Sequence, residues 1–237
     1  FYRDIWWDSS VYIGMGKYIF SLGKSGLWEE SRPLILPSIL GAGWKLNLNV
    51  VYFGRALSLI FAVLVVFVIY KLSSKLFSRK IGLLAAFFTA FSYTFIFFSS
   101  NILTEIPSAL FVLLAVYYFF DNRFFLMGML SGIAVMTRFF QAFALIGLYL
   151  VFFAYFFRKP NFHKKLFYIV IGVSLFILPY ALLNYYLYGN VLLPFQVQAH
   201  RIKTTGWEHY KEYGFYFTGL LKENFFGNIA RLTTVRR

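Results

Sequence analysis

One acidic side chain, Glu105, lies in a run of forty residues, 81–120, that contains no other charge. A carboxylate placed deep in hydrocarbon costs about 2.5 to 3.5 kcal/mol, so a residue of this kind is a candidate for function. The simpler interpretation is a helix start, with Thr104 as N-cap, the acid in the first turn, and Pro107 where its missing N–H costs nothing. In a functional role, the carboxylate could bind a cation or orient an arginine.

Two isolated cations match this acid. Arg138 is the only charged residue between Phe124 and Phe157, and Arg55 lies near the start of the first long apolar run. Snorkelling from a helix end is the simpler explanation for each of them. Isolated charges at one membrane depth nevertheless indicate a shared polar cavity.

The segment WWDSSVY places Asp8 between Trp7 and Tyr12. The simpler interpretation is a helix N-cap, with Ser9 or Ser10 competing for that position. The functional interpretation is a carboxylate at the membrane face, beside aromatic rings that could stack on a sugar.

Further polar residues could complete a site. Asp4 is an alternative to Asp8, and Arg32 is held extended by the following proline, although residues 29–32 also fit a surface turn. The chain has no Cys and no HExxH motif, so the metal signal is weak, but His200 or His209 could contribute ligands together with Glu105.

The composition is that of a membrane protein, because 60% of the residues are hydrophobic and 14% are charged. Apolar runs of about 18 residues can cross a hydrocarbon core about 30 Å thick, and backbone in lipid must be helical or in a closed barrel. We therefore predict an all-α polytopic transmembrane bundle. Its domains are an outer loop with interfacial helices (1–49), six spans (50–184), and an outer loop with a C-terminal segment (185–237). The six spans are Val50–Tyr70, Ile81–Phe98, Ile106–Phe120, Phe124–Met136, Phe139–Phe157 and Leu166–Asn184.

The short loops predict the orientation. Segments 71–80, 121–123 and 158–165 together hold nine Lys and Arg, whereas the opposite turns at 99–105 and 137–138 hold one. By the positive-inside rule the basic loops are cytoplasmic. This distribution also accounts for much of the net charge of +14, so we expect no nucleic-acid partner.

The order of these features resembles the membrane glycosyltransferases of the GT-C fold, in particular the dolichyl-phosphate-mannose protein mannosyltransferases and the aminoarabinose transferases. Two departures are the replacement of the family's Tyr-Ser-Arg by residues 99–101 and the lack of its first and last spans. We therefore expect the chain, which begins at Phe1, to be a fragment truncated at both ends. The similar segments are WDSSVYIGMGKYIFSLG, SRPLILPSIL, GRALSLIFAVL, LTEIPSALFVLLAVYYF and GMLSGIAVMTRFFQAFAL.

The resemblance implies transfer of a sugar from a polyprenyl-phosphate-linked donor to an acceptor protein, glycan or lipid. We expect this reaction to invert the anomeric carbon, on the outer face of a prokaryotic plasma membrane. Asp8 would be the general base, and Glu105 would hold a divalent metal ion, with His200 as a second ligand, or would orient an arginine; we expect no other cofactor. The substrate-binding residues would be Arg138, Arg55, Arg32, Tyr12 and Asp4.

The alternatives are a secondary transporter and a noncatalytic membrane scaffold. Transporters usually place their isolated charges near the membrane midplane. Here the charges are predicted at one face, which favours the transferase.

Overall fold

The computed structural model describes residues 5–194 and 196–197, and this part of the chain contains no strand. The chain divides into two units, residues 1–191 and 192–237, and the helices described below all lie in the first. The predicted all-α helical membrane bundle is confirmed. The helices are α1 (Trp7–Phe20), α2 (Ile35–Lys45), α3 (Val50–Leu76), α4 (Arg79–Ala90), α5 (Tyr93–Ser100), α6 (Glu105–Phe120), α7 (Phe124–Thr137), α8 (Gln141–Phe156) and α9 (Phe162–Tyr188).

Each of the six predicted spans corresponds to apolar helix, but their lengths differ. Helices α3 and α9 have 27 residues each and are long and apolar enough to cross a membrane. Helices α6, α7 and α8 are equally apolar but have only 16, 14 and 16 residues. Many Leu, Ile, Val and Phe side chains are exposed on α3, α4, α8 and α9, and they require lipid around them, because water would solvate this surface poorly.

The second predicted span, Ile81–Phe98, corresponds to two helices and not to one continuous helix, so whether it crosses the membrane stays a prediction. Helix α4 ends at Ala90 and α5 begins at Tyr93, and the two are bent by 61°. The break follows from Ser92, whose backbone is extended and whose Oγ accepts a hydrogen bond from the Phe95 N–H at 3.2 Å. A serine that caps a helix start competes with continuation of the preceding helix.

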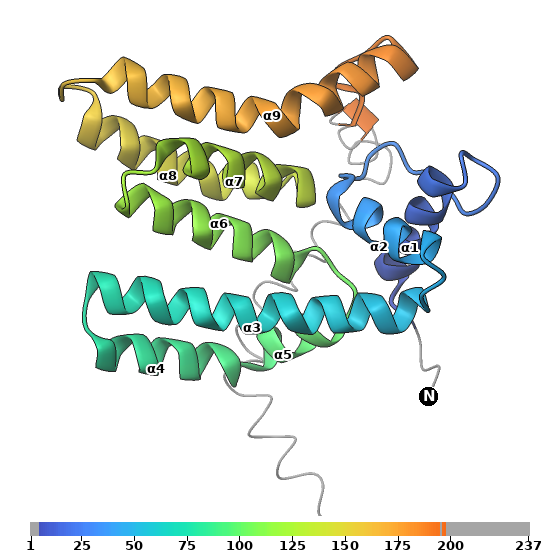
Figure 1. Ribbon diagram of the computed structural model, residues 1–237, viewed down its shortest axis with the longest axis horizontal. Coiled ribbons are helices and arrows are strands. Elements are labelled where there is room, and N and C mark those ends of the chain that lie inside the picture. Colours follow the sequence, from blue (N-terminus) through green and yellow to red (C-terminus); the bar gives the residue numbers. More distant parts are fainter. Residues whose placement is uncertain (1–4, 195, 198–237) are drawn as a thin grey trace, which may run out of the picture. The chain divides into compact units, whose positions relative to one another are not determined.

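The turns of the bundle lie at two ends (Figure 1), and most of the charged residues lie in or beside these turns. We call one the basic end; it is made of the turns α3–α4, α6–α7 and α8–α9. The other, the paired end, consists of α1, α2, the loop between them, the start of α6 and the α7–α8 turn. In Figure 1 the basic end lies at the left and the paired end at the right.

Two close helix contacts hold these ends in place. A Cβ at Gly128 of α7 would lie 2.3 Å from the Ile169 carbonyl oxygen of α9, and one at Gly16 of α1 would lie 2.6 Å from the Pro37 carbonyl oxygen of α2. Small residues at such crossings allow helix backbones to approach closely in membrane proteins. The α7–α9 contact forms a wall of the basic end, and the α1–α2 contact fixes the helix pair of the paired end.

Candidate functional site

Helix α1 and the loop before α2 bring an arginine between two acids. The Arg32 Nη2 donates to the Asp8 Oδ1 at 2.6 Å, and its Nε lies 3.4 Å from the Glu29 Oε1. Burial by itself lowers the pKa of the Arg32 guanidinium, but the Asp8 hydrogen bond and the nearby Tyr12, Asp8 and Glu29 more than compensate, so that the pKa is raised overall. Arg32 is therefore a permanent cation that fixes the position of Asp8.

Tyr12 connects this group to the start of α6. Its ring is buried, and its hydroxyl accepts a hydrogen bond from the Arg32 Nη1 at 3.2 Å and lies 3.4 Å from the Thr104 Oγ1. The Arg32 guanidinium also lies over the Tyr12 ring, 5.4 Å from its centroid, within the range of a cation–π contact. The Tyr12 phenol thus connects Arg32 to Thr104, a residue 92 positions from Tyr12 in the sequence.

Neither Thr104 nor Asp8 caps a helix with its side chain, although both were considered as N-caps. Thr104 does occupy the N-cap position of α6, but its side chain makes no capping hydrogen bond. Its hydroxyl faces Tyr12 instead. Asp8 is not an N-cap, because α1 begins at Trp7 and Asp8 lies in the first helical turn. Both side chains therefore serve contacts between helices rather than helix ends.

Next to Thr104, Glu105 forms an ion pair with Arg138. Helix α7 ends at Thr137, and the extended backbone of Arg138 turns its side chain out of the helical path. Both side chains are about one third exposed, with relative accessibilities of 27% for Glu105 and 33% for Arg138. The structure thus pairs two isolated charges that the sequence analysis had matched with each other.

Sequence reasoning missed one polar contact beside this ion pair. The Gln141 Nε2 donates to the Ser108 Oγ at 2.8 Å, and Ser108 is fully buried on α6. This hydrogen bond ties the start of α8 to α6, one helical turn after Glu105. The available signal was a glutamine and a serine, each in an otherwise apolar run.

Four further residues were predicted to contribute to the site, namely Arg55, Asp4, His200 and His209. Arg55 lies near the start of α3, half-buried, and makes no ion pair within the described part of the chain. Asp4, His200 and His209 lie outside the described residues. The predictions for these three therefore stay predictions.

The described residues do not assemble a metal centre. Within residues 5–194 and 196–197, no group of three or more His, Asp or Glu side chains could hold a metal ion. The Glu105 carboxylate, the predicted ligand in this part of the chain, is paired with a guanidinium. A divalent cation needs several oxygen or nitrogen ligands, which one carboxylate beside a cation does not supply. The mechanism proposed below contains no metal-dependent step.

Comparison with protein families matches residues 31–182 to the dolichyl-phosphate-mannose-protein mannosyltransferase family. The chain belongs to this family. A search of curated proteins found no match. A search of solved structures also found none.

Family membership makes the chain a membrane glycosyltransferase of the GT-C type that uses a polyprenyl-phosphate sugar donor. This result confirms the family resemblance and favours the transferase over the transporter and scaffold alternatives. The matched region includes Arg32, Arg55, Glu105 and Arg138 but begins after Asp8. Asp8 is connected to the matched region through its hydrogen bond with Arg32.

Proposed function

We propose that the chain transfers the sugar to its acceptor at the paired end, on the outer face of the membrane, in one inverting displacement. The observation that supports this proposal is the connected network from Asp8 through Arg32, Tyr12 and Thr104 to the Glu105–Arg138 pair. It draws on α1, the loop before α2, the start of α6 and the α7–α8 turn. A base and a phosphate-binding cation are the two groups that such a transfer needs.

In this proposal Asp8 is the general base. Its side chain is 37% exposed, so an acceptor hydroxyl can reach it. The hydroxyl oxygen attacks the anomeric carbon as its proton passes to the carboxylate, and the bond from that carbon to the phosphate oxygen breaks. Because the nucleophile enters opposite the leaving phosphate, the configuration at the anomeric carbon inverts.

Arg138 would bind the departing polyprenyl phosphate. An arginine has five N–H donors, and the ion pair with Glu105 is made through Nη1, which leaves other donors for phosphate oxygens. Glu105 then orients Arg138, whereas Arg32 is already engaged by Asp8, Tyr12 and Glu29 and acts as a positioning residue. Arg55, half-buried near the start of α3, would assist at the phosphate.

The role of Asp8 can be tested in the full-length protein reconstituted in liposomes with a polyprenyl-phosphate sugar. Asp8→Asn should lower transfer by about 100-fold or more, as general bases contribute about 10² to 10⁴. Asp8→Glu should retain part of the activity, and its pH profile should shift. Undiminished transfer by Asp8→Asn at any pH would remove Asp8 from the base role.

The role of Glu105 separates two mechanisms. If it orients Arg138, chelation of divalent cations should leave transfer within about twofold, and Glu105→Gln should raise KM for the donor. The predicted alternative, a divalent metal ion at Glu105, would instead make transfer depend on added Mg²⁺ or Mn²⁺ after chelation. Titration of metal into the chelated protein decides between them.

The orientation of the protein in the membrane can be tested with single-cysteine variants, because the chain contains no Cys of its own. Lys24→Cys places a thiol at the paired end, and Lys80→Cys places one at the basic end. In intact cells, a membrane-impermeant maleimide should label only the Lys24→Cys protein. Labelling of only the Lys80→Cys protein would reverse the proposed sidedness.

A further inference from the structure

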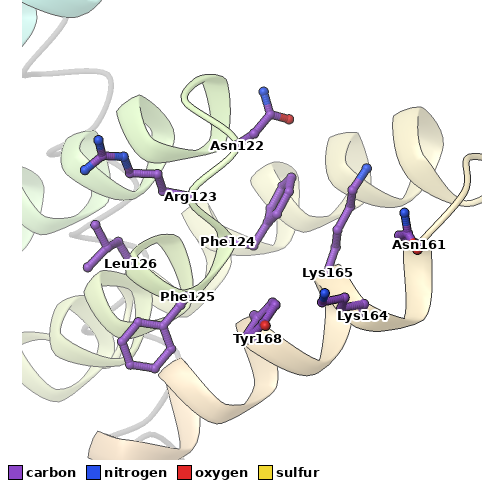
Figure 2. A pocket seen from close by; sticks show the side chains of 9 residues that line it. All are labelled: Asn122, Arg123, Phe124, Phe125, Leu126, Asn161, Lys164, Lys165 and Tyr168. Atoms are coloured by element: carbon purple, nitrogen blue, oxygen red, sulfur yellow. The ribbon is translucent and has the colours of Figure 1, made fainter.

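A separate cavity of about 510 Å³ lies at the basic end. It is formed by the α6–α7 turn, the start of α7 and the first turns of α9. Figure 2 shows side chains from both helices arranged around it. The lining residues are Asn122, Arg123, Phe124, Phe125, Leu126, Asn161, Lys164, Lys165 and Tyr168.

The cavity is strongly basic and has no acid in its lining. Arg123, Lys164 and Lys165 contribute three cations. The nearest acid in sequence, Asp121, forms an ion pair with Lys75 of α3. An anion that entered the cavity would therefore meet three positive charges without repulsion from a lining carboxylate.

Two of these cations are available to a ligand. The Lys165 ammonium lies over the Phe156 ring, 4.1 Å from its centroid, and is held there by cation–π contact. The side chains of Arg123 and Lys164 form no hydrogen bond or ion pair within the described part of the chain. Their charge is uncompensated beside a hollow that is large enough for a phosphorylated headgroup.

Apart from Asn122 and Asn161, the rest of the lining is aromatic or aliphatic, and part of it is exposed on the outside of the bundle. Phe124 is buried, whereas Phe125 and Tyr168 are 39% and 42% exposed. A ligand that carries both an anionic group and an aliphatic chain fits such a surface better than a free inorganic anion does. Basic pockets between helices near a membrane surface bind anionic lipid headgroups for this reason.

We propose that this cavity binds the headgroup of an anionic phospholipid from the leaflet at the basic end. Arg123 and Lys164, which lie on opposite sides of the cavity in Figure 2, would contact the headgroup from two sides, and Phe125 and Tyr168 would contact the adjacent glycerol and acyl carbons. Such a lipid would fill the space between the starts of α7 and α9. The proposal requires no sugar transfer, so it stands or fails independently of the proposed function.

The proposal can be tested by native mass spectrometry of the detergent-purified full-length protein with added phosphatidylglycerol or phosphatidylcholine. The wild type should retain phosphatidylglycerol in preference to phosphatidylcholine. The double variant Arg123→Gln/Lys164→Gln should bind phosphatidylglycerol about thirty-fold more weakly, from the loss of two cations near the headgroup. The variant Arg123→Lys/Lys164→Arg, which exchanges the two residue types and keeps both positive charges, should retain most of the binding.

The matched control removes two cations from the same end but outside the cavity. Arg79→Gln/Lys80→Gln should bind phosphatidylglycerol within about twofold of the wild type, and thermal unfolding without lipid should show that all variants are folded. Equal losses in both double variants would indicate a diffuse basic surface and overturn the proposal. Equal retention of phosphatidylcholine, or displacement of the lipid by millimolar inorganic phosphate, would also overturn it.

Discussion

The two ends of the bundle differ in how far their charged side chains are paired. At the basic end, nine Lys and Arg in three turns accompany one acid, Asp121. At the paired end, three acids are engaged by two arginines, through the Arg32 contacts with Asp8 and Glu29 and the Glu105–Arg138 pair. An excess of one sign attracts headgroups from a distance, whereas a paired, partly buried network places individual groups precisely enough for chemistry. This difference is the basis of the proposal that one end orients the protein in the membrane and the other carries its reaction.

The largest expected effect comes from removing Arg138 at the paired end, with removal of an arginine at the basic end as the control. Arg138→Gln should lower transfer by about 100-fold or more, because a cation at the developing phosphate charge is lost and Glu105 is left unpaired. Transfer is measured in liposomes with the polyprenyl-phosphate sugar as donor. Arg158→Gln, an exposed residue of the α8–α9 turn, is the matched control and should stay within about twofold. Similar losses in both variants would contradict the division between the two ends.

A stability comparison tests the wall between α7 and α9. Gly128→Ala should destabilise the protein by about 1 to 3 kcal/mol, since its Cβ would lie 2.3 Å from the Ile169 carbonyl oxygen. Gly147→Ala in α8 has nothing within 4 Å and should stabilise by about 0.5 to 1 kcal/mol. Thermal unfolding in one detergent measures both. If the two changes shifted the melting temperature alike, the close α7–α9 contact would be wrong.

A smaller effect tests the connection within the paired end. Tyr12→Phe removes the hydroxyl between Arg32 and Thr104 and should reduce transfer by about three- to tenfold, at a stability cost of about 1 kcal/mol. Tyr18→Phe, on the same helix, should have little effect. A double-mutant cycle of Asp8→Asn and Glu105→Gln, repeated in the Tyr12→Phe background, measures the coupling. Coupling that persists without the hydroxyl would exclude Tyr12 as the connection.

The smallest expected effect is a change in how protein stability depends on alkaline pH. The pKa of the Arg32 guanidinium is raised in the folded protein. Its contribution to the free energy of unfolding is therefore complete below the unfolded-state pKa. That contribution is lost only as pH rises through the folded-state pKa, which lies above the accessible pH range. Wild-type stability should therefore show no alkaline loss from this residue. Arg32→Lys, with an ordinary lysine pKa of about 10.4, should lose stability as pH rises towards and above 10. Thermal unfolding from pH 7 to 11 compares the two proteins.

Sequence patterns predicted the helical segments better than their continuity. Apolar runs mark a helix in lipid because the backbone has no other way to satisfy its polar groups, and α3 and α6 begin within one residue of the predicted spans. The bend between α4 and α5 was missed because the cap at Ser92 is a local signal inside a uniformly apolar run. Apolar composition alone carries no information about such a break.

The charges of the site and the match of Glu105 with an arginine were predictable, but its other contacts were not. Glu105 and Arg138 were identifiable because an isolated charge in an apolar run is costly. The Arg32–Asp8 ion pair depends on how the loop before α2 folds back on α1, and the Tyr12–Thr104 contact depends on how α1 meets the start of α6. Residues 24 and 92 positions apart have no local signal for such contacts.

The unequal helix lengths set the depth at which a donor would react. Ile106, beside Glu105, packs in one cluster with Ala62 of α3. Ala62 is twelve residues from the start of α3 at Val50 (62 − 50), or about 18 Å at about 1.5 Å per residue. Glu105 therefore lies alongside α3, past its first turn at Val50, which packs in one cluster with Tyr12 of α1 and Leu40 of α2. In the proposed function, a donor phosphate that reached the Glu105–Arg138 pair would enter beside the α1–α2 pair, and water would have to follow it.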